Sequence, residues 1–63
     1  MDYQQFDVVK LVNGVPEDGI EPGTTAVILD VFDGPHPHYE VEVTGTDSLY
    51  TMGVAPDEIE PAP

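Results

Sequence analysis

The chain has 63 residues, of which 40% are hydrophobic, and it carries 13 acidic residues against one basic residue, Lys10, for a formal net charge of −12. A chain this short folds as one domain with a small core, and without cysteine it has no disulfide and no thiolate ligand for zinc. The charge excludes nucleic acid and anionic membranes as partners, because both are negatively charged. We expect a single domain over residues 1–63, with frayed ends at 1–4 and 61–63.

The first predicted strand covers residues 6–12, where β-branched side chains are interrupted by single polar ones. The adjacent Val8 and Val9 break the alternation, which favours either a bulge or a strand buried on both faces. Phe6, at the start of this segment, is expected in the core.

A long irregular loop is predicted for residues 13–23, which hold three glycines and two prolines. Val15 and Ile20 are its large apolar residues. We expect these two side chains to pin the loop to the rest of the domain.

Residues 24–32 form the strongest predicted strand, long enough to be curved and central. Strict alternation puts Ala26, Ile28 and Phe32 on one face, and Phe32 is expected in the core. The following "DGPHPH" is predicted to be a turn, made rigid by its two prolines.

In the "YEVEVTG" segment, residues 39–45, apolar and polar side chains alternate. This pattern predicts an antiparallel strand with one solvent-exposed face, which carries Glu40 and Glu42. A weaker strand is predicted for residues 48–54. Pro56 then favours one 3₁₀ turn, after which Ile59 returns to the core on a short last strand.

Together these segments predict an all-β fold, namely a small five-stranded antiparallel SH3-like barrel. It has a long first loop and one 3₁₀ turn before the last strand. Closure into a barrel would remove the exposed sheet edges that an open meander leaves.

The two histidines, His36 and His38, are separated by one residue, which on an extended chain directs both rings to the same side. Asp33, Glu40 or Glu42 could supply a third metal ligand. The interleaved prolines favour a stiff turn instead, so no metal and no cofactor are predicted. A small metal-binding or catalytic protein that uses the histidines with nearby carboxylates is kept as an alternative.

Enzymatic chemistry finds no other support in the sequence. The one serine, Ser48, has no nucleophile motif around it, and phosphate-binding and calcium-binding loop motifs are absent. A catalytic carboxyl group needs burial or a charged neighbour that shifts its pKa, and the sequence singles out no such residue. The chain is therefore predicted not to be an enzyme.

The acids are interpreted as a surface for a basic protein partner, which they would attract over a distance. Solubility and adaptation to high salt explain the same composition and remain alternatives. Two tyrosines could line a groove beside the acids, as in peptide-binding barrels, although packing in the core or at its rim explains them as well. The predicted partner-binding residues are Glu17, Asp18, Glu21, Tyr39, Glu40, Glu42 and Tyr50.

The chain resembles the small bacterial family known as domain of unknown function 4926 over nearly its whole length. The matching stretches are "DVVKL", "VPEDGIEPG", the valine-rich strand and "YEVEV". Matching positions are Asp7, Val8, Val9, Leu11, Pro16, Glu17, Gly19, Ile20, Gly23, 27–31 and 39–43. The chain departs at Ala26, where the family often has glycine, and at the longer "GPHPH" turn. The resemblance implies an SH3-like barrel and a scaffolding role for "PEDG", and it brings no established activity and no histidine pair.

The leading hypothesis is therefore a non-enzymatic, acidic protein-interaction module, such as an immunity protein, an inhibitor or an accessory subunit. Homo-oligomerisation through an uncovered strand is a further alternative, since it would enlarge a small core. No segment has the length of a membrane span or the pattern of a secretory signal, so a cytoplasmic location is expected.

Overall fold

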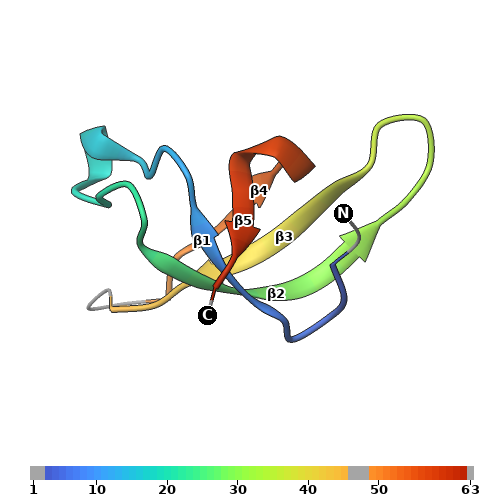
Figure 1. The fold of residues 1–63 in the computed structure, drawn as a ribbon, viewed down its shortest axis with the longest axis horizontal. Helices are drawn as coiled ribbons and strands as arrows, with labels where there is room; N and C mark the ends of the chain where they lie inside the picture. Colours follow the sequence, from blue (N-terminus) through green and yellow to red (C-terminus); the bar gives the residue numbers. More distant parts are fainter. Residues whose placement is uncertain (1–2, 46–48, 63) are drawn as a thin grey trace.

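The computed structural model describes residues 3–45 and 49–62 and shows an all-β chain with five strands in one antiparallel sheet (Figure 1). The strand order is β4-β3-β2-β1-β5, so the last strand pairs with the first. Two 3₁₀ turns, η1 in the first loop and η2 before β5, complete the described elements. Their bounds are β1 Val8–Leu11, η1 Pro16–Asp18, β2 Thr25–Phe32, β3 His38–Val43, β4 Thr51–Val54, η2 Pro56–Glu58 and β5 Ile59–Pro61.

This arrangement confirms the predicted all-β fold, the five antiparallel strands, the long first loop and the 3₁₀ turn before the last strand. The strand ends differ. β1 starts at Val8, two residues later than predicted, and β4 starts at Thr51, three residues later. Ser48, where β4 was predicted to begin, lies outside the described residues. The structure adds η1, a 3₁₀ turn within the loop that is predicted to be irregular.

A β-bulge interrupts the pairing of β2 with β3. Ile28 faces Val41 and Asp30 faces Glu40, so Leu29 is the extra residue on β2. Neither of the two explanations considered for the adjacent Val8 and Val9 holds. Both residues pair in register with β2, so there is no bulge between them, and Val8 is 50% exposed, so the strand is not buried on both faces. The irregularity falls on the longest strand, where one extra residue adds local twist and bend.

The bulge reverses which side chains of β2 face the core. Before it, Ala26 and Ile28 point inward and have no exposed surface. After it, Phe32 pairs with His38 on the opposite face and is 43% exposed, so its predicted core position is wrong. The physical reason is that a strand alternates strictly, and one inserted residue shifts every later side chain to the other face. Phe6 is also outside the core, at 67% exposed.

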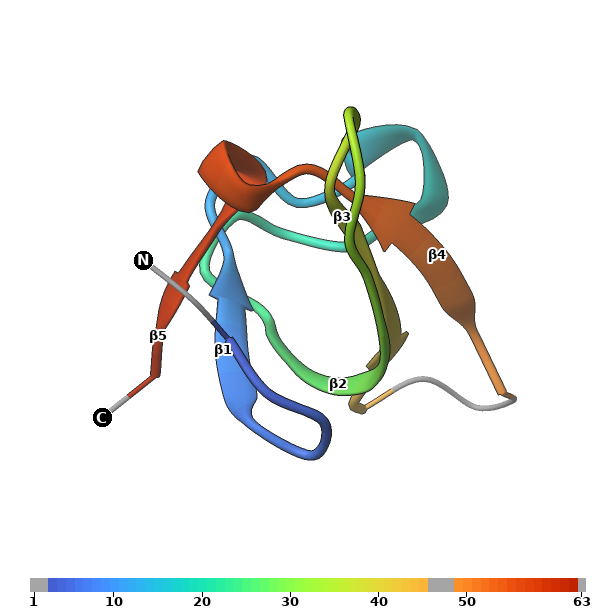
Figure 2. The same ribbon diagram turned by 90° about the vertical axis from the view of Figure 1, so that its right-hand side faces the viewer.

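The core lies on the concave side of the curled sheet. β2 runs along the bottom of a trough, β1 and β5 rise on one side, β3 and β4 rise on the other, and η2 crosses between them (Figure 2). The predicted inward residues of β3 and Ile20 of the first loop are all buried there. The buried set is Tyr3, Val9, Leu11, Ile20, Ala26, Ile28, Tyr39, Val41, Val43, Val54 and Ile59.

The first loop is held by backbone hydrogen bonds as well as by packing. Val15 and Ile20 form an isolated antiparallel bridge. The Val15 N–H donates to the Ile20 carbonyl at 2.7 Å, and the Ile20 N–H donates to the Val15 carbonyl at 3.1 Å. Val15 also packs against the core. The predicted pinning of the loop is therefore confirmed. Within η1 the Gly19 N–H donates to the Pro16 carbonyl, and Gly19 takes φ +76°, a conformation that favours glycine.

The two ends of the described chain pack against the sheet. Tyr3 is buried, and its ring meets Tyr39 edge-on with centroids 5.6 Å apart. Pro61 pairs with Val9, and the Ala62 N–H donates to the Val8 carbonyl. Of the segments expected to fray, residues 1–2 and 63 lie outside the described residues. Within the described part, no helix has the length and hydropathy needed to cross a membrane.

Candidate functional site

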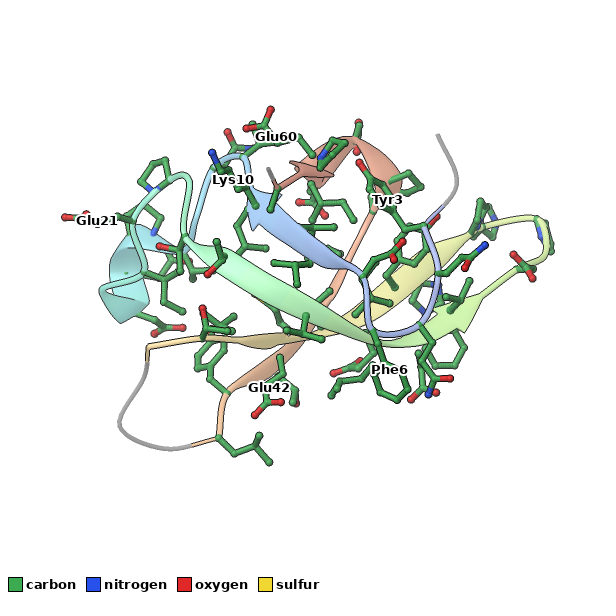
Figure 3. All side chains as sticks on the ribbon, turned by 60° about the horizontal axis from the view of Figure 1, so that its bottom comes forward. Tyr3, Phe6, Lys10, Glu21, Glu42 and Glu60 are labelled. Carbon is green, nitrogen blue, oxygen red and sulfur yellow. The ribbon has the colours of Figure 1, made fainter. Side chains whose placement is uncertain are left out.

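Three acids of the first loop, together with the tyrosine that contacts one of them, form what we call the loop surface: Glu17, Asp18, Glu21 and Tyr50. The Tyr50 hydroxyl donates a hydrogen bond to Asp18 Oδ2 at 2.7 Å, which links β4 to η1 across 32 residues of sequence. Tyr50 is half-buried against the core, whereas the three acids are exposed. The structure thus brings together three of the predicted partner-binding residues, Glu17, Asp18 and Tyr50. Glu21, on the same loop, points outward at this end of the molecule (Figure 3).

The electrostatics of this surface favour the protonated tyrosine. The hydrogen bond to Asp18 raises the pKa of Tyr50 above its usual 10.0, with smaller contributions from burial and from the negative charges of Asp18 and Glu17. Tyr50 is therefore a neutral hydrogen-bond donor at physiological pH. It orients one carboxylate of the loop and leaves the others free for a partner.

A second group of acids lies on the convex face of the sheet, the side away from the core. Glu40 and Glu42 alternate with the buried side chains of β3 and are half-buried on this outer face. The cross-strand neighbour of Glu40 is Asp30, so two carboxylates face each other across β2 and β3. Like charges placed directly opposite one another in a sheet are unfavourable.

The same face exposes apolar side chains, among them the two phenylalanines that are predicted in the core. Val8 is 50% exposed and pairs with Val27, whose next neighbour across the sheet is Glu42. Phe32 stacks its ring on His38, with centroids 4.7 Å apart and planes 12° from parallel. We call this mixed surface the outer patch, and it comprises Phe6, Val8, Val27, Phe32, Asp30, Glu40 and Glu42.

Phe6 is the most exposed aromatic residue of the outer patch and has an unusual backbone. Its φ of +74° lies in the left-handed region, and it is the one described residue other than glycine with a positive φ. Its N–H donates to the Ile28 carbonyl, which fixes the chain beside β2. Phe6 and Glu42 project from the same side of the sheet (Figure 3).

Lys10, the only lysine or arginine of the chain, lies two residues after Val8 on the same face of β1. It pairs across β1 and β5 with Glu60, and both side chains lie at the side of the molecule opposite to Phe6 and Glu42 (Figure 3). The outer patch therefore contains no lysine or arginine that could neutralise its acids.

Tyr39 differs from the other predicted partner-binding residues because it is a core residue. It is 6% exposed, packs edge-on against Tyr3, and its hydroxyl accepts a hydrogen bond from the Tyr3 N–H at 3.4 Å. Burial, with the nearby Tyr39, raises the pKa of Tyr3. Because the clean alternation of β3 points Tyr39 inward with Val41 and Val43, it has no surface to offer a partner.

The histidines lie at the tip between β2 and β3, at the opposite end of the long axis from the first loop (Figure 1). Both are exposed, and His38 Nδ1 is 3.1 Å from the carbonyl oxygen of its neighbour His36. Across residues 3–45 and 49–62, no three histidine or acidic side chains come together as a metal site would require. His38 instead uses its ring to stack on Phe32.

No protein-family model matches the chain, and no match is found among curated proteins or solved structures. The resemblance to domain of unknown function 4926 thus stays a prediction from the residues themselves.

The outer patch could have been found in part from the sequence. Its acids follow from the alternation in "YEVEV", which predicts their outward direction. Its apolar half depends on the bulge at Leu29 and on the left-handed turn at Phe6, and neither has a glycine or other marker residue.

Proposed function

We propose that this chain is a non-enzymatic interaction module that binds a basic protein surface through its carboxylates. The observation that supports this most is the distribution of charge. Every Asp and Glu in the described part of the chain is exposed or half-buried, and the one lysine lies away from the acids of the outer patch. Such a surface attracts a cationic partner and accelerates the encounter with it.

Burial supports a binding role over a catalytic one. Among the described residues, no polar or charged side chain is buried. An acid that works in catalysis is commonly shifted in pKa by desolvation or by a close charge in a water-excluded site. Exposed and half-buried carboxylates lack that environment, and they suit long-range attraction and salt-bridge formation at an interface.

We further propose that the curled sheet belongs to the SH3-like barrels, and that the chain is related to domain of unknown function 4926. Three features support this fold: β1 lies between β2 and β5, a long loop joins β1 to β2, and η2 leads directly into β5. The two edge strands, β4 and β5, are joined through η2, so a small further curl of the sheet would bring its edges together. An immunity protein, an inhibitor or an accessory subunit that acts in the cytoplasm fits this description.

The test is the recovery of partners from a lysate of the native host at about 0.05 M and about 0.5 M salt, with the chain as bait, where the higher salt screens charges beyond a few ångströms. The recovered proteins are expected to be basic and to be lost at the higher salt. A control bait with Glu17→Gln, Asp18→Asn, Glu40→Gln and Glu42→Gln should lose them at both. Retention of the same partners under all conditions would show that charge does not direct binding.

A further inference from the structure

We infer that the outer patch, rather than the loop surface, is the docking surface, and that its partner presents apolar side chains flanked by lysine or arginine. This inference rests on the proposed function and names the surface and the partner chemistry that the function requires. The first observation is the exposure of Phe6, Val8 and Phe32 at 67%, 50% and 43%. Three large apolar residues on one face of a 63-residue chain form the kind of cluster that marks an interaction site.

The backbone at Phe6 supplies an independent observation. A bulky residue held at φ +74° has a less favourable backbone conformation than the same residue at negative φ, and glycine would avoid that cost. The chain instead places an aromatic ring there and leaves most of it in water. Strain at an exposed aromatic residue is accounted for if the ring serves a contact outside the domain, since the domain itself gains little from its burial.

The charges around the apolar residues specify the partner. Asp30 and Glu40 face each other across the sheet, and Glu42 lies next to Val27. A cationic side chain inserted between the facing carboxylates would remove their mutual repulsion, while an apolar side chain would cover Phe6 and Val8. The complementary surface is therefore amphipathic and basic, with aromatic or aliphatic anchors at its centre.

A second copy of the chain fits this surface poorly. Two copies would bring together acidic patches of the same sign, on molecules that each carry a net charge of −12. The loop surface is also less suitable as the anchor. Its apolar residues, Val15 and Ile20, are half-buried and buried, and one of its carboxylates already accepts the Tyr50 hydroxyl.

The experiment uses two short synthetic peptides of equal length and charge, one that alternates lysine with leucine and one that alternates lysine with serine. Each is titrated into the nitrogen-15-labelled chain while the backbone amide signals are followed. The lysine–leucine peptide is expected to bind at least about tenfold more tightly, because it alone supplies an apolar anchor. Its largest shifts should fall on the amides of Phe6, Val8, Phe32, Glu40 and Glu42.

Phe6→Gly is the decisive variant, since glycine accepts the left-handed backbone and the fold should be retained, as thermal unfolding will show. It should weaken the lysine–leucine peptide about tenfold and leave the lysine–serine peptide unchanged. Val12→Ala is the matched control, because Val12 is 40% exposed but lies past the end of β1, where its N–H donates to the Glu58 carbonyl of η2. It should change neither affinity.

Three outcomes would overturn the inference: equal affinity of the two peptides, shifts confined to the loop surface, or unchanged binding by Phe6→Gly. These outcomes leave the proposed function intact, because a charged peptide still binds. Absence of binding by both peptides at low salt would contradict the proposed function as well. If sedimentation showed the molecular mass of the chain doubling as its concentration rises, the occupant of the outer patch would be a second copy of the chain instead.

Discussion

Two aromatic residues of this chain illustrate how little residue type alone says about role. Phe6 belongs to a class that is usually buried, yet it lies in water on a strained backbone. Tyr50 resembles an exposed recognition residue, yet its hydroxyl is already engaged by Asp18. In both cases the backbone conformation and the neighbours decide the role.

The Tyr50–Asp18 hydrogen bond predicts a specific titration. Asp18→Asn removes the carboxylate that raises the pKa of Tyr50, so this pKa should return toward 10.0. Because the folded pKa is raised, the bond contributes stability that is present below pH 10 and is lost as pH rises above it. The wild-type chain should therefore lose more stability than Asp18→Asn between neutral pH and the alkaline range.

Carbon-13 signals of the tyrosine ring, followed against pH, will measure this pKa for each tyrosine separately. Glu21→Gln is the control, because Glu21 lies on the same loop and does not contribute to the Tyr50 pKa. An unchanged Tyr50 pKa in Asp18→Asn would mean that the hydrogen bond does not persist in solution.

At the scale of elements, the first loop is the feature whose conformation depends most on single positions. Gly14 has φ +60°, and a Cβ placed on it would lie within 2.7 Å of the Glu21 carbonyl oxygen. Gly19, in the same loop, has φ +76° but no atom within 4 Å of such a Cβ. Replacing each glycine with alanine therefore separates two costs: a left-handed backbone at both positions, and a steric clash at Gly14 alone.

Gly14→Ala should accordingly destabilise the fold by about 3 kcal/mol or more, because backbone atoms cannot move aside without displacing the loop. Gly19→Ala should cost only about 1 kcal/mol, the price of the backbone conformation. Urea unfolding of both variants measures the difference. Equal destabilisation would indicate that the loop is free to shift and that the contact with Glu21 is not rigid.

The bulge in β2 matters more for the proposed docking surface than the glycines of the first loop do. It lets one strand supply Ala26 and Ile28 to the core and then deliver Phe32 to the outer face. Without the extra residue at Leu29, Phe32 would point inward and His38 would lose its stacking partner. The apolar half of the outer patch is thus a product of one irregular pairing.

At the scale of the whole molecule, the charge opposes folding. Packing most of the acids onto the surface of a globule with a radius of gyration of 10.9 Å brings like charges closer than they lie in the unfolded chain. A small core has little stability to set against this repulsion. Screening by ions or by a partner should therefore stabilise the fold.

The stability of the chain should rise with salt. Raising the concentration of sodium chloride from about 0.01 M to about 0.5 M shortens the screening length from about 30 Å to a few ångströms, and the free energy of unfolding should increase by roughly 1 kcal/mol. Asp30→Asn should reproduce part of this gain at low salt, because it removes the pair that faces Glu40. Asp33→Asn, at the exposed tip, is the control and should gain less. A free energy of unfolding that is independent of salt would contradict this account.

The amino-acid sequence sufficed to predict the strands, their order along the chain, most of the core and the acidic character. The alternation of apolar and polar residues and the positions of glycine and proline are properties of short segments, and the net charge follows from composition. None of them depends on how distant segments pack. The alternation along β3 predicts that Tyr39, Val41 and Val43 point inward and that Glu40 and Glu42 point outward, as they do. The acidic half of the outer patch was therefore predictable.

The apolar half of the outer patch, and the separation of the acids into the loop surface and the outer patch, depend on how distant segments pack together. The hydrogen bond between Tyr50 and Asp18 joins residues 32 apart, and the outward turn of Phe32 depends on a register shift against β3. Both result from pairing between distant segments, whose relative position is set by the balance of all contacts in the sheet. No local pattern encodes that balance, so a core phenylalanine and a surface phenylalanine look alike until the strands are paired.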